Sequence, residues 1–342
     1  MSKTIDPDHG LYVPGSSKWS FIYNFRKNYG KNYRTSKCGM SIKKDGAVFS
    51  KASQSGNSVL HGGNIMSCGS IWTCPHCASR ICSARKDELD SVLSWARSEG
   101  YSMYHVTYTL PHTKYDKLDR TLGDLKFLRS KIFSGRWAKD FKNDHNFVGS
   151  VRVLEITNSL TNGWHPHFHE IIIFKNDFQI ERKEVSTSSK PHDILKDVLW
   201  SRYIKYASRM GLQRNPSFKH GLKVTEANQN GAFYFTKWGL STEMTGRVKK
   251  SAREGSLTPF EILNSNDPEM IKLGHEYIKS MEGQRAIVMS NGLKIMAGID
   301  SFDDKDLLER EEEQVEEWDV HTPHEIWPVS YTHLTLPTIC SV

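Results

Sequence analysis

The sequence predicts an α+β protein in which helices cover one face of an antiparallel sheet, of the ferredoxin-like or RRM-like kind, with a cysteine-rich module on its N-terminal side. Two observations lead to this prediction. Segments with strand and helix patterns follow one another in the order strand, helix, strand, strand between residues 105 and 174. Five of the six cysteines lie upstream of them, between residues 38 and 82.

The composition is that of a globular chain. Of its 342 residues, 37% are hydrophobic and 25% are charged, as in soluble domains. No apolar run approaches the ~20 residues that a membrane-spanning helix needs. Residues 1–14 contain no apolar stretch of the kind found in secretory signals. We therefore expect a cytoplasmic protein that does not bind membranes.

Charge is distributed unevenly along the chain. Residues 1–260 carry 40 Lys and Arg against 22 Asp and Glu, whereas residues 261–342 carry 6 against 17. A basic body predicts a polyanionic partner, and nucleic acid is the commonest one because its backbone charge is dense. The alternative is an ordinary solvated surface, which would have the same composition.

The chain is expected to consist of an N-terminal extension (1–37), a cysteine-rich module with a basic helix (38–98), a central domain (99–300), an acidic, incomplete tail (301–328) and a C-terminal remnant (329–342). The run VSYTHLTLPT in this remnant resembles the translation of an adapter used in sequencing libraries. The remnant, with Cys340, is therefore left out of the fold prediction. Within the acidic tail, residues 303–317 predict one helix.

The clustered cysteines predict a structural zinc site. In the segment Cys74-Pro75-His76-Cys77, the C-x-x-C spacing lets two sulfurs reach one tetrahedral ion. Cys68 and Cys38 can complete a four-cysteine site, and Cys82 or His76 could replace one of the four. The odd number of cysteines and their crowding argue against disulfides.

The alternative to zinc is a redox motif of thioredoxin type, which requires a C-x-x-C pair that opens a helix after a strand. The polar, Gly-rich residues 50–70 do not predict that strand, so zinc is favoured. Downstream, Arg80, Arg85 and Lys86 begin a predicted amphipathic helix that runs to about Ser98. Its basic residues could contact DNA, or they could be solvated.

The central domain begins with the predicted strands and helix. Alternation and β-branched residues predict a strand at residues 105–110, and leucine spacing predicts a helix at residues 118–133. Further strands are predicted at residues 147–157 and 167–174, and residues 158–163 between them predict a hairpin turn.

The strand at the end of this series carries the main functional signal, because residues 164–169 (WHPHFH) contain three histidines. Alternate residues of a strand face the same side, so His167 and His169 are expected to point together, opposite to Phe168. Antiparallel pairing could add Glu155 as a third ligand, and such a set suits Mg²⁺ or Mn²⁺ with positions open for phosphate oxygens. The alternative is a pair of surface histidines on an edge strand. The apolar run that follows argues against it, because it predicts burial on both faces.

A second helix supplies a candidate nucleophile. Residues 231–239 predict a helix that ends at its last glycine, and Tyr234 and Lys237 share a face of it. A phenol close to a metal and an ammonium group can attack phosphate. The rival phenols, Tyr203 and Tyr206, belong to a predicted helix whose apolar spacing indicates packing.

In this order, the cysteine segment, the histidine strand and the Tyr-x-x-Lys helix resemble the plasmid rolling-circle replication initiators of the Rep class 1 family, in the HUH endonuclease superfamily. The resemblance covers most of residues 38–300. It is carried by residues 106–112 (VTYTLPH), 154–157 (LEIT), 162–169 (NGWHPHFH), 234–239 (YFTKWG), 243–245 (EMT), 258–263 (TPFEIL), 284–285 (QR) and 290–294 (SNGLK).

The resemblance implies the HUH fold for the central domain and a site-specific endonuclease that nicks and rejoins one strand of a plasmid or phage origin. It implies that His167, His169 and Glu155 hold the catalytic metal. It further implies that Tyr234 is the nucleophile and that Lys237 holds a phosphate or lowers the pKa of the phenol. The nick would leave a 5′-phosphotyrosine and a free 3′-hydroxyl primer. The implied partners are single-stranded or hairpin origin DNA and a host helicase and polymerase.

The remaining predicted residues are placed around this site. Glu243 resembles the acidic residue with which some members activate water at termination. A rotation of ~100° per residue puts it opposite Tyr234 on one continuous helix, so it joins the site only if that helix breaks near its glycine. His165, Trp164 and Trp238 are expected near the metal or against DNA, because aromatic rings stack on bases. For the two tryptophans the alternative is packing in the core.

Two alternatives to a replication initiator stay open at this point. The protein could be a zinc-containing DNA-binding regulator without catalysis, whose histidines are structural. It could also be an HUH transposase or relaxase, which differs from an initiator in what happens after the nick.

Overall fold

The computed structural model describes residues 17–42, 47–54, 57–180, 188–212, 216–227, 256–313 and 320–322. The predicted Tyr-x-x-Lys helix lies outside these ranges, and so do four predicted site residues: Tyr234, Lys237, Trp238 and Glu243. Among the helices in the described part of the chain, none is long and apolar enough to cross a membrane.

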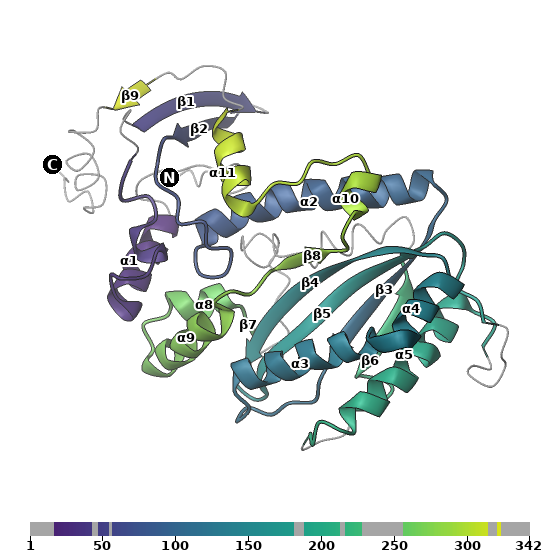
Figure 1. Ribbon diagram of the computed structural model, residues 1–342. Helices are drawn as coiled ribbons and strands as arrows, with labels where there is room; N and C mark the ends of the chain where they lie inside the picture. Colours follow the sequence, from purple (N-terminus) through teal and green to yellow (C-terminus); the bar gives the residue numbers. More distant parts are fainter. Residues whose placement is uncertain are drawn as a thin grey trace.

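The centre of the molecule is an antiparallel sheet (Figure 1). Its strands are β3 (Ser102–Thr109), β4 (Phe147–Ser159), β5 (Gly163–Phe174), β6 (Leu222–Glu226), β7 (Ser256–Leu257) and β8 (Ile287–Met289). They are arranged in the order β6-β3-β5-β4-β7, and β8 also pairs with β4. Helix α3 (Leu118–Ile132) connects β3 to β4, and α5 (Pro191–Ala207) connects β5 to β6. This β-α-β-β-α-β order with β3 and β5 in the centre is ferredoxin-like, so the predicted α+β class is confirmed.

Helices α3, α4 (Gly135–Asp144) and α5 lie on one face of this sheet (Figure 1). The predicted apolar face of α3 is confirmed, because its leucines at 118, 122, 125 and 128 are buried. Arg129 of α3 forms an ion pair with Glu170 of β5, whose side chain is fully buried. Apolar contact and a buried pair of charges therefore both fix α3 to the middle of the sheet.

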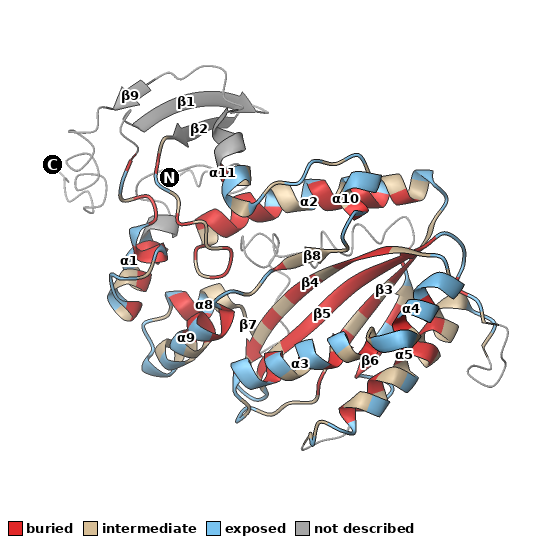
Figure 2. Cartoon of the chain, in the orientation of Figure 1, coloured by how far each residue is buried: buried red, intermediate tan, exposed pale blue. Residues whose placement is uncertain are grey.

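Strand β5 is buried on both faces, as its apolar run predicts. Residues 171–174 are 0% exposed, and the strand is mostly red in Figure 2. The strand begins earlier than predicted, at Gly163, and the hairpin turn shrinks to residues 160–162. Gly163 has φ +78°, and a Cβ there would lie 2.7 Å from the Lys114 Cα. Glycine is therefore required at this position.

The other face of the sheet is partly covered by α2 (Pro75–Ser98) and α10 (Leu293–Met296) (Figure 1). The Leu293 side chain lies against Gly149 of β4, where an added Cβ would come within 2.9 Å of it. Lys294 of α10 forms an ion pair of 2.8 Å with Glu88 of α2. The two helices are thereby joined to each other and to β4.

Helix α2 begins at Pro75, earlier than predicted. Of the three basic residues predicted at its start, Lys86 is exposed, as in one of the two alternatives expected, whereas Arg80 and Arg85 contact the tail. Arg80 is buried and donates a hydrogen bond of 2.8 Å to the Leu308 carbonyl of α11 (Asp304–Glu313). Arg85 forms an ion pair of 2.6 Å with Asp304. The predicted acidic tail helix is thus confirmed over most of its length, and it covers Arg80 and Arg85. Arg80 is thereby removed from solvent, and Arg85 is partly buried.

The N-terminal part contains α1 (Ser17–Tyr29), η1 (Thr35–Lys37) and a small sheet of β1 (Ala47–Gln54), β2 (Asn57–Gly63) and β9 (Val320–Thr322). The expectation that residues 50–70 form no strand is wrong, because β1 and β2 pair as an antiparallel hairpin. This hairpin pairs with β9 of the tail, and among the described residues these three strands form a sheet of their own.

Helix α1 packs against α8 (Pro259–Asn264) and α9 (Pro268–Met281), with the rings of Phe21 and Phe260 5.8 Å apart. One cluster of buried side chains runs from α1 through the main sheet to α11. The division into a separate extension, module and central domain stays a prediction.

Gly274 of α9 allows a test of the contact between α1 and α9. A Cβ at this position would lie 2.1 Å from the Tyr29 hydroxyl oxygen. Gly274→Ala is therefore expected to lower the free energy of unfolding by about 1–3 kcal/mol, as overpacking does, measured by urea denaturation. The matched control is Gly123→Ala in α3, where nothing lies within 4 Å of the added carbon. It should be neutral or stabilise by up to about 1 kcal/mol. Equal effects of the two substitutions would contradict the close contact.

Candidate functional site

The predicted metal ligands meet on the face of the sheet opposite to α3. Glu155 of β4 is directly opposite His167 of β5 in the register, and Val153 is opposite His169. The Glu155 Oε2 lies 2.6 Å from the His167 Nε2 and 2.7 Å from the His169 Nε2. The three residues thus form a group that could hold a metal ion.

A neighbouring strand supports this group. The His169 Nδ1 lies 3.1 Å from the His105 Nε2 and 3.3 Å from the Thr107 Oγ1, both on β3. The His167 Nδ1 lies 3.3 Å from the His165 carbonyl oxygen, to which it donates. Contacts at Nδ1 fix the orientation of a ring and leave Nε2 for a metal. The structure therefore provides both histidines with partners that direct Nε2 towards Glu155.

The electrostatics favour an ionised Glu155 carboxylate beside histidines whose pKa values shift in different directions. Burial lowers the pKa of His169, whereas the Glu155 carboxylate raises that of His167 against the effect of burial. Burial opposes ionisation of Glu155, but the charges and hydrogen bonds of His167 and His169 outweigh it and hold its pKa well below the usual value. Burial lowers the pKa of His105 to about 3 and, together with the proximity of His167, that of His165 to about 4. Neutral imidazoles and a carboxylate are the forms that bind metal ions.

His165 and Trp164, which were also predicted near this group, have different surroundings. The His165 ring lies 5.1 Å from that of His167 and 4.7 Å from that of His112, but His165 is not part of the metal-binding group. Its role near the metal or against DNA stays a prediction. Trp164 is only 2% exposed and stacks on Tyr277 of α9 with ring centroids 5.6 Å apart. This packing contradicts the prediction that Trp164 contacts DNA.

The predicted cysteine set is also brought together. Cys74 directly precedes α2, Cys77 lies in its first turn, Cys68 lies in the preceding loop and Cys38 directly follows η1. The sulfurs of Cys38 and Cys77, of Cys68 and Cys77, and of Cys38 and Cys74 are each 3.6 Å apart. All four thiols are free and buried. They form a second group that could hold a metal ion.

The two alternative ligands do not join this group. Cys82 and His76 are both buried on α2, but neither is among the four residues whose ligand atoms lie close together. The C-x-x-C pair does open a helix, as in a redox motif, yet two further thiols surround it. Burial raises the pKa of the Cys74 thiol, whereas hydrogen bonds from Cys38 and the other thiols lower that of Cys77. Four buried thiols of this kind ionise together only with a cation among them.

The cysteine group and the histidine strand are connected through α9. The Tyr277 hydroxyl, next to the stacked Trp164 ring, donates a hydrogen bond of 3.2 Å to the Trp72 carbonyl. The Trp72 Nε1 donates in turn to the Gln284 carbonyl at 2.9 Å. The loop that carries Cys68 and Cys74 is therefore attached to the helix that also packs against the start of β5.

The rival phenols are accounted for by packing. Tyr203 is 0% exposed, and its hydroxyl donates a hydrogen bond of 2.5 Å to the Thr109 carbonyl. Burial also raises its pKa well above the ordinary value. Tyr206 lies partly buried beside Arg202. Phe168 is buried on the helix-covered face, with the Arg152 guanidinium 4.7 Å from its ring centroid. The prediction that Phe168 points away from the histidines is thereby confirmed.

His105 and Thr107 were not predicted as part of the site. The only available signal was their i, i+2 spacing on the predicted strand at residues 105–110, which places them on one face. That this face adjoins His169 follows from the pairing of Thr107 with His169. The pairing of strands so distant in sequence could not be derived from local patterns.

The comparisons with known proteins found two relatives of similar sequence identity. A protein named "Protein rep" from Streptomyces lividans is 28% identical over 317 aligned residues, which cover 74% of this chain and 69% of that protein. A "Neomycin resistance protein" from Streptomyces cyanogenus is 28% identical over 153 residues, or 37% of this chain and 34% of that protein. No family model and no solved structure matches the chain.

The first of these relatives can be compared with the family that the sequence motifs resemble. The similarity to a Rep protein extends over most of the chain. The resemblance to replication initiators of the Rep kind is thereby confirmed. Membership of the HUH superfamily stays a prediction.

The supporting role of His105 can be tested by metal binding. Removal of a group that orients a metal ligand typically weakens metal affinity by about 10–100-fold. We therefore expect His105→Ala to weaken Mn²⁺ binding by such a factor, measured by equilibrium dialysis. His112→Ala is the control, because His112 contacts the His165 ring but no ligand of the group, and it should change the affinity less than twofold. Equal losses in the two variants would show that His105 has no specific role.

Proposed function

We propose that this protein initiates rolling-circle replication of a plasmid or phage by nicking one strand of the origin with a tyrosine. The observation that carries the proposal is the group of Glu155, His167 and His169, whose ligand atoms converge from adjacent strands. Similarity to a protein named Rep supports it. The ferredoxin-like order of the central sheet is compatible with the HUH fold that the sequence motifs imply.

The metal proposed for this group is Mg²⁺ or Mn²⁺. Two imidazole nitrogens directed at one carboxylate oxygen, in a buried polar site, fit a divalent ion. When bound, the ion would polarise the scissile phosphate. The chain's own contribution is to hold the ligands through His105 and Thr107 and to exclude water with the apolar residues of β5.

The nucleophile proposed is Tyr234. Its phenolic oxygen would form a bond to phosphorus while the bond between phosphorus and the 3′ oxygen breaks. The phenolic proton passes to solvent, and the departing 3′ oxygen takes up a proton to become the primer hydroxyl. Lys237 would favour the ionised phenol by its charge, and Glu243 would activate water at termination. Because the phosphotyrosine ester retains the bond energy, the strand can be rejoined without ATP.

The cysteine group is proposed to hold structural Zn²⁺. Bonds of ~2.3 Å in a tetrahedral site place the sulfurs about 3.8 Å apart, close to the 3.6 Å separations observed. The ion would stabilise the loop that attaches to α9 through Trp72. A host helicase and polymerase are proposed as partners on the family resemblance alone.

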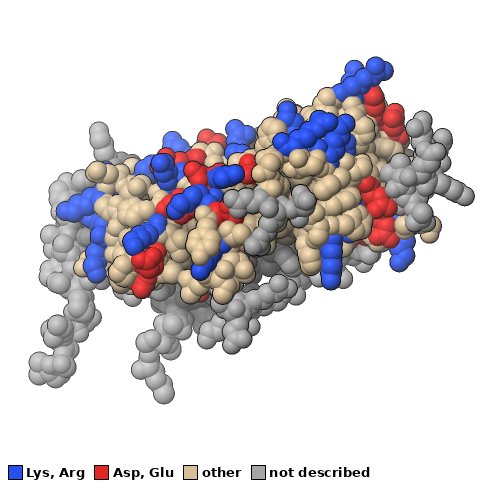
Figure 3. Space-filling view, turned by 90° about the horizontal axis from the view of Figure 1, so that it is seen from below, with Lys and Arg blue, Asp and Glu red and all other residues tan. Residues whose placement is uncertain are grey.

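The face in Figure 3 bears on how origin DNA would be held. Lys and Arg side chains lie there in separate groups, several of them next to Asp and Glu. Contacts to DNA are therefore expected at discrete positions on this face, and not over one continuous basic surface.

The nicking reaction can be tested with an origin oligonucleotide and Mn²⁺ on a denaturing gel. Wild-type protein should form a covalent adduct, and Tyr234→Phe should reduce it at least 10³-fold, roughly the loss that follows removal of a nucleophile. Tyr206→Phe is the matched control and should retain the adduct. His169→Ala and EDTA should both abolish it.

Other outcomes of this assay identify the alternatives. An adduct that survives in Tyr234→Phe would assign the nucleophile to another tyrosine. Tight binding to the correct origin without any adduct would leave the zinc-containing DNA-binding regulator. Adducts that are resolved only into recombined strands would favour a transposase or relaxase.

The zinc site can be tested by metal analysis of the purified protein. Wild type and Cys82→Ser should each contain one zinc per chain, because Cys82 lies outside the group of four. Cys74→Ser should lose the zinc and unfold at lower temperature, since folding and zinc binding are coupled at such sites. Retention of zinc in Cys74→Ser, or its loss in Cys82→Ser, would contradict the proposed ligands.

A further inference from the structure

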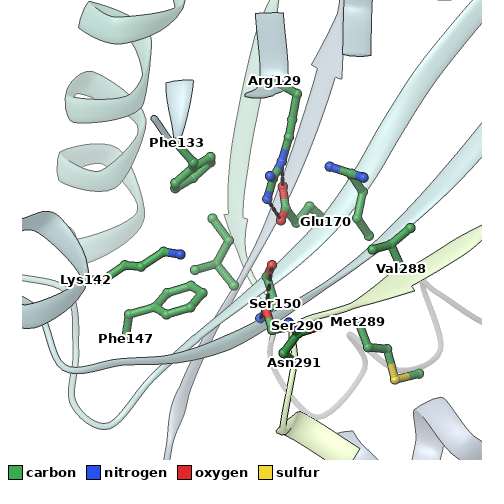
Figure 4. A pocket seen from close by; sticks show the side chains of 12 residues that line it. Arg129, Phe133, Lys142, Phe147, Ser150, Glu170, Val288, Met289, Ser290 and Asn291 are labelled. Carbon is green, nitrogen blue, oxygen red and sulfur yellow. Dashed lines mark hydrogen bonds and ion pairs between the residues drawn. The ribbon is translucent and has the colours of Figure 1, made fainter. Parts of the chain in front are cut away.

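A cavity of about 220 Å³ lies on the face of the sheet opposite to the metal ligands (Figure 4). Glu170 and Ile172 of β5 line it, and these residues alternate with His167 and His169, which face the other side. Its walls come from α3, α4, β4, β5 and the segment that begins at β8. Charged side chains, Arg129, Lys142, Arg152 and Glu170, and the aromatic rings of Phe133 and Phe147 line it.

The cavity contains positive charge that the described residues do not neutralise. Three cations line it, but only Arg129 has a carboxylate partner, the fully buried Glu170. Lys142 and Arg152 form no ion pair with any residue in the described part of the chain. Each lies near an aromatic ring, with Lys142 5.1 Å from the Phe147 centroid and Arg152 4.7 Å from the Phe168 centroid. The cavity therefore has three cations, of which Lys142 is exposed at its rim, and one carboxylate, Glu170.

The position of Arg152 is electrostatically unfavourable without an anion. Burial, together with the proximity of Arg129, lowers the pKa of its guanidinium, although the charge of Glu170 acts in the opposite direction. One carboxylate is thus shared by two guanidinium groups. Removing a charge from water and placing it next to a like charge both cost free energy, which a bound anion would offset. Arg152 and Lys142 are therefore poised to bind a ligand of negative charge.

Polar groups at the other wall can complete such a site. The Ser150 backbone N–H donates to the Ser290 Oγ at 2.8 Å, and the Ser290 N–H donates to the Ser150 carbonyl at 2.9 Å. These bonds hold the two hydroxyl groups 3.4 Å apart. A hydroxyl hydrogen can rotate towards an acceptor. Asn291 next to them is exposed and brings an amide to the rim.

We propose that this pocket binds a phosphate group carried by a nucleotide, either within a DNA strand or free in solution. Its volume is below the roughly 300–1,000 Å³ of pockets for drug-sized ligands, and it suits a phosphate with its sugar. Phe133 and Phe147 supply apolar surface beside the cations. The choice of a nucleotide as carrier rests on the proposed function, but the pocket does not depend on the nicking chemistry.

Binding to the full chain in EDTA tests this proposal without the metal ligands. The probes are a fluorescent single-stranded 12-mer of unrelated sequence, followed by anisotropy, and dAMP, followed by calorimetry. Lys142→Gln and Arg152→Gln should each weaken the binding of at least one probe about tenfold, as loss of a charge-assisted hydrogen bond does. Lys139→Gln removes the same charge from an exposed position of α4 outside the cavity. It should change the affinity less than twofold.

The two probes distinguish the sources of the phosphate. If both variants weaken dAMP binding, the pocket accepts free nucleotides. If they weaken only the 12-mer and reduce its salt dependence by about one phosphate contact, the pocket holds a strand of DNA. If Lys142→Gln behaves like Lys139→Gln with both probes, the proposal is wrong. Lys142 is exposed at the surface, so this variant is decisive even if Arg152→Gln does not fold.

The outcome is separable from that of the nicking assay. A protein that forms no covalent adduct can still show the difference between Lys142→Gln and Lys139→Gln, which would support the pocket and contradict the nuclease. A covalent adduct, together with equal binding by Lys142→Gln and Lys139→Gln, would support the nuclease and contradict the pocket.

Discussion

The antiparallel register of β4 and β5 is the constraint on which the site depends. It sets Glu155 directly opposite His167 and within reach of His169, so one carboxylate oxygen lies within 2.7 Å of two imidazole nitrogens. A shift by one residue would move every side chain of a strand to the other face. The buried residues on both faces of β5 make such a shift costly. The packing that stabilises the sheet therefore also assembles the candidate metal ligands.

Each face of the β4–β5 pair carries a carboxylate, Glu170 on one and Glu155 on the other. The two carboxylates have different kinds of partner. On the face covered by α3, Glu170 is neutralised by the permanent charge of Arg129. On the opposite face, Glu155 is surrounded by histidines, whose charge depends on protonation and on bound metal. The first arrangement is fixed and serves the packing of α3. The charge of the second arrangement changes with protonation of the histidines.

Local patterns predicted the elements and ligands that depend on neighbours in sequence. The leucine face of α3, the shared face of His167 and His169, and the four cysteines all follow from short spacings. The burial of Trp164 was not predictable, because its partner Tyr277 is far away in sequence. The contacts of α11 with Arg80 and Arg85, and of His105 with His169, were not predictable for the same reason. Long-range pairing determines these contacts, and short spacings contain no information about it.

The tight turn between β4 and β5 limits how the chain can change in length. Gly163 lies so close to Lys114 that even a methyl group does not fit, whereas Leu160 at the tip of the turn is 60% exposed. An insertion at the exposed tip, outside the paired residues, is therefore expected to disturb the fold less than one at Gly163. Because of this contact, a change in the length of the chain around residue 163 would require a matching change around residue 114. The hairpin therefore fixes the spacing of twelve residues between Glu155 and His167.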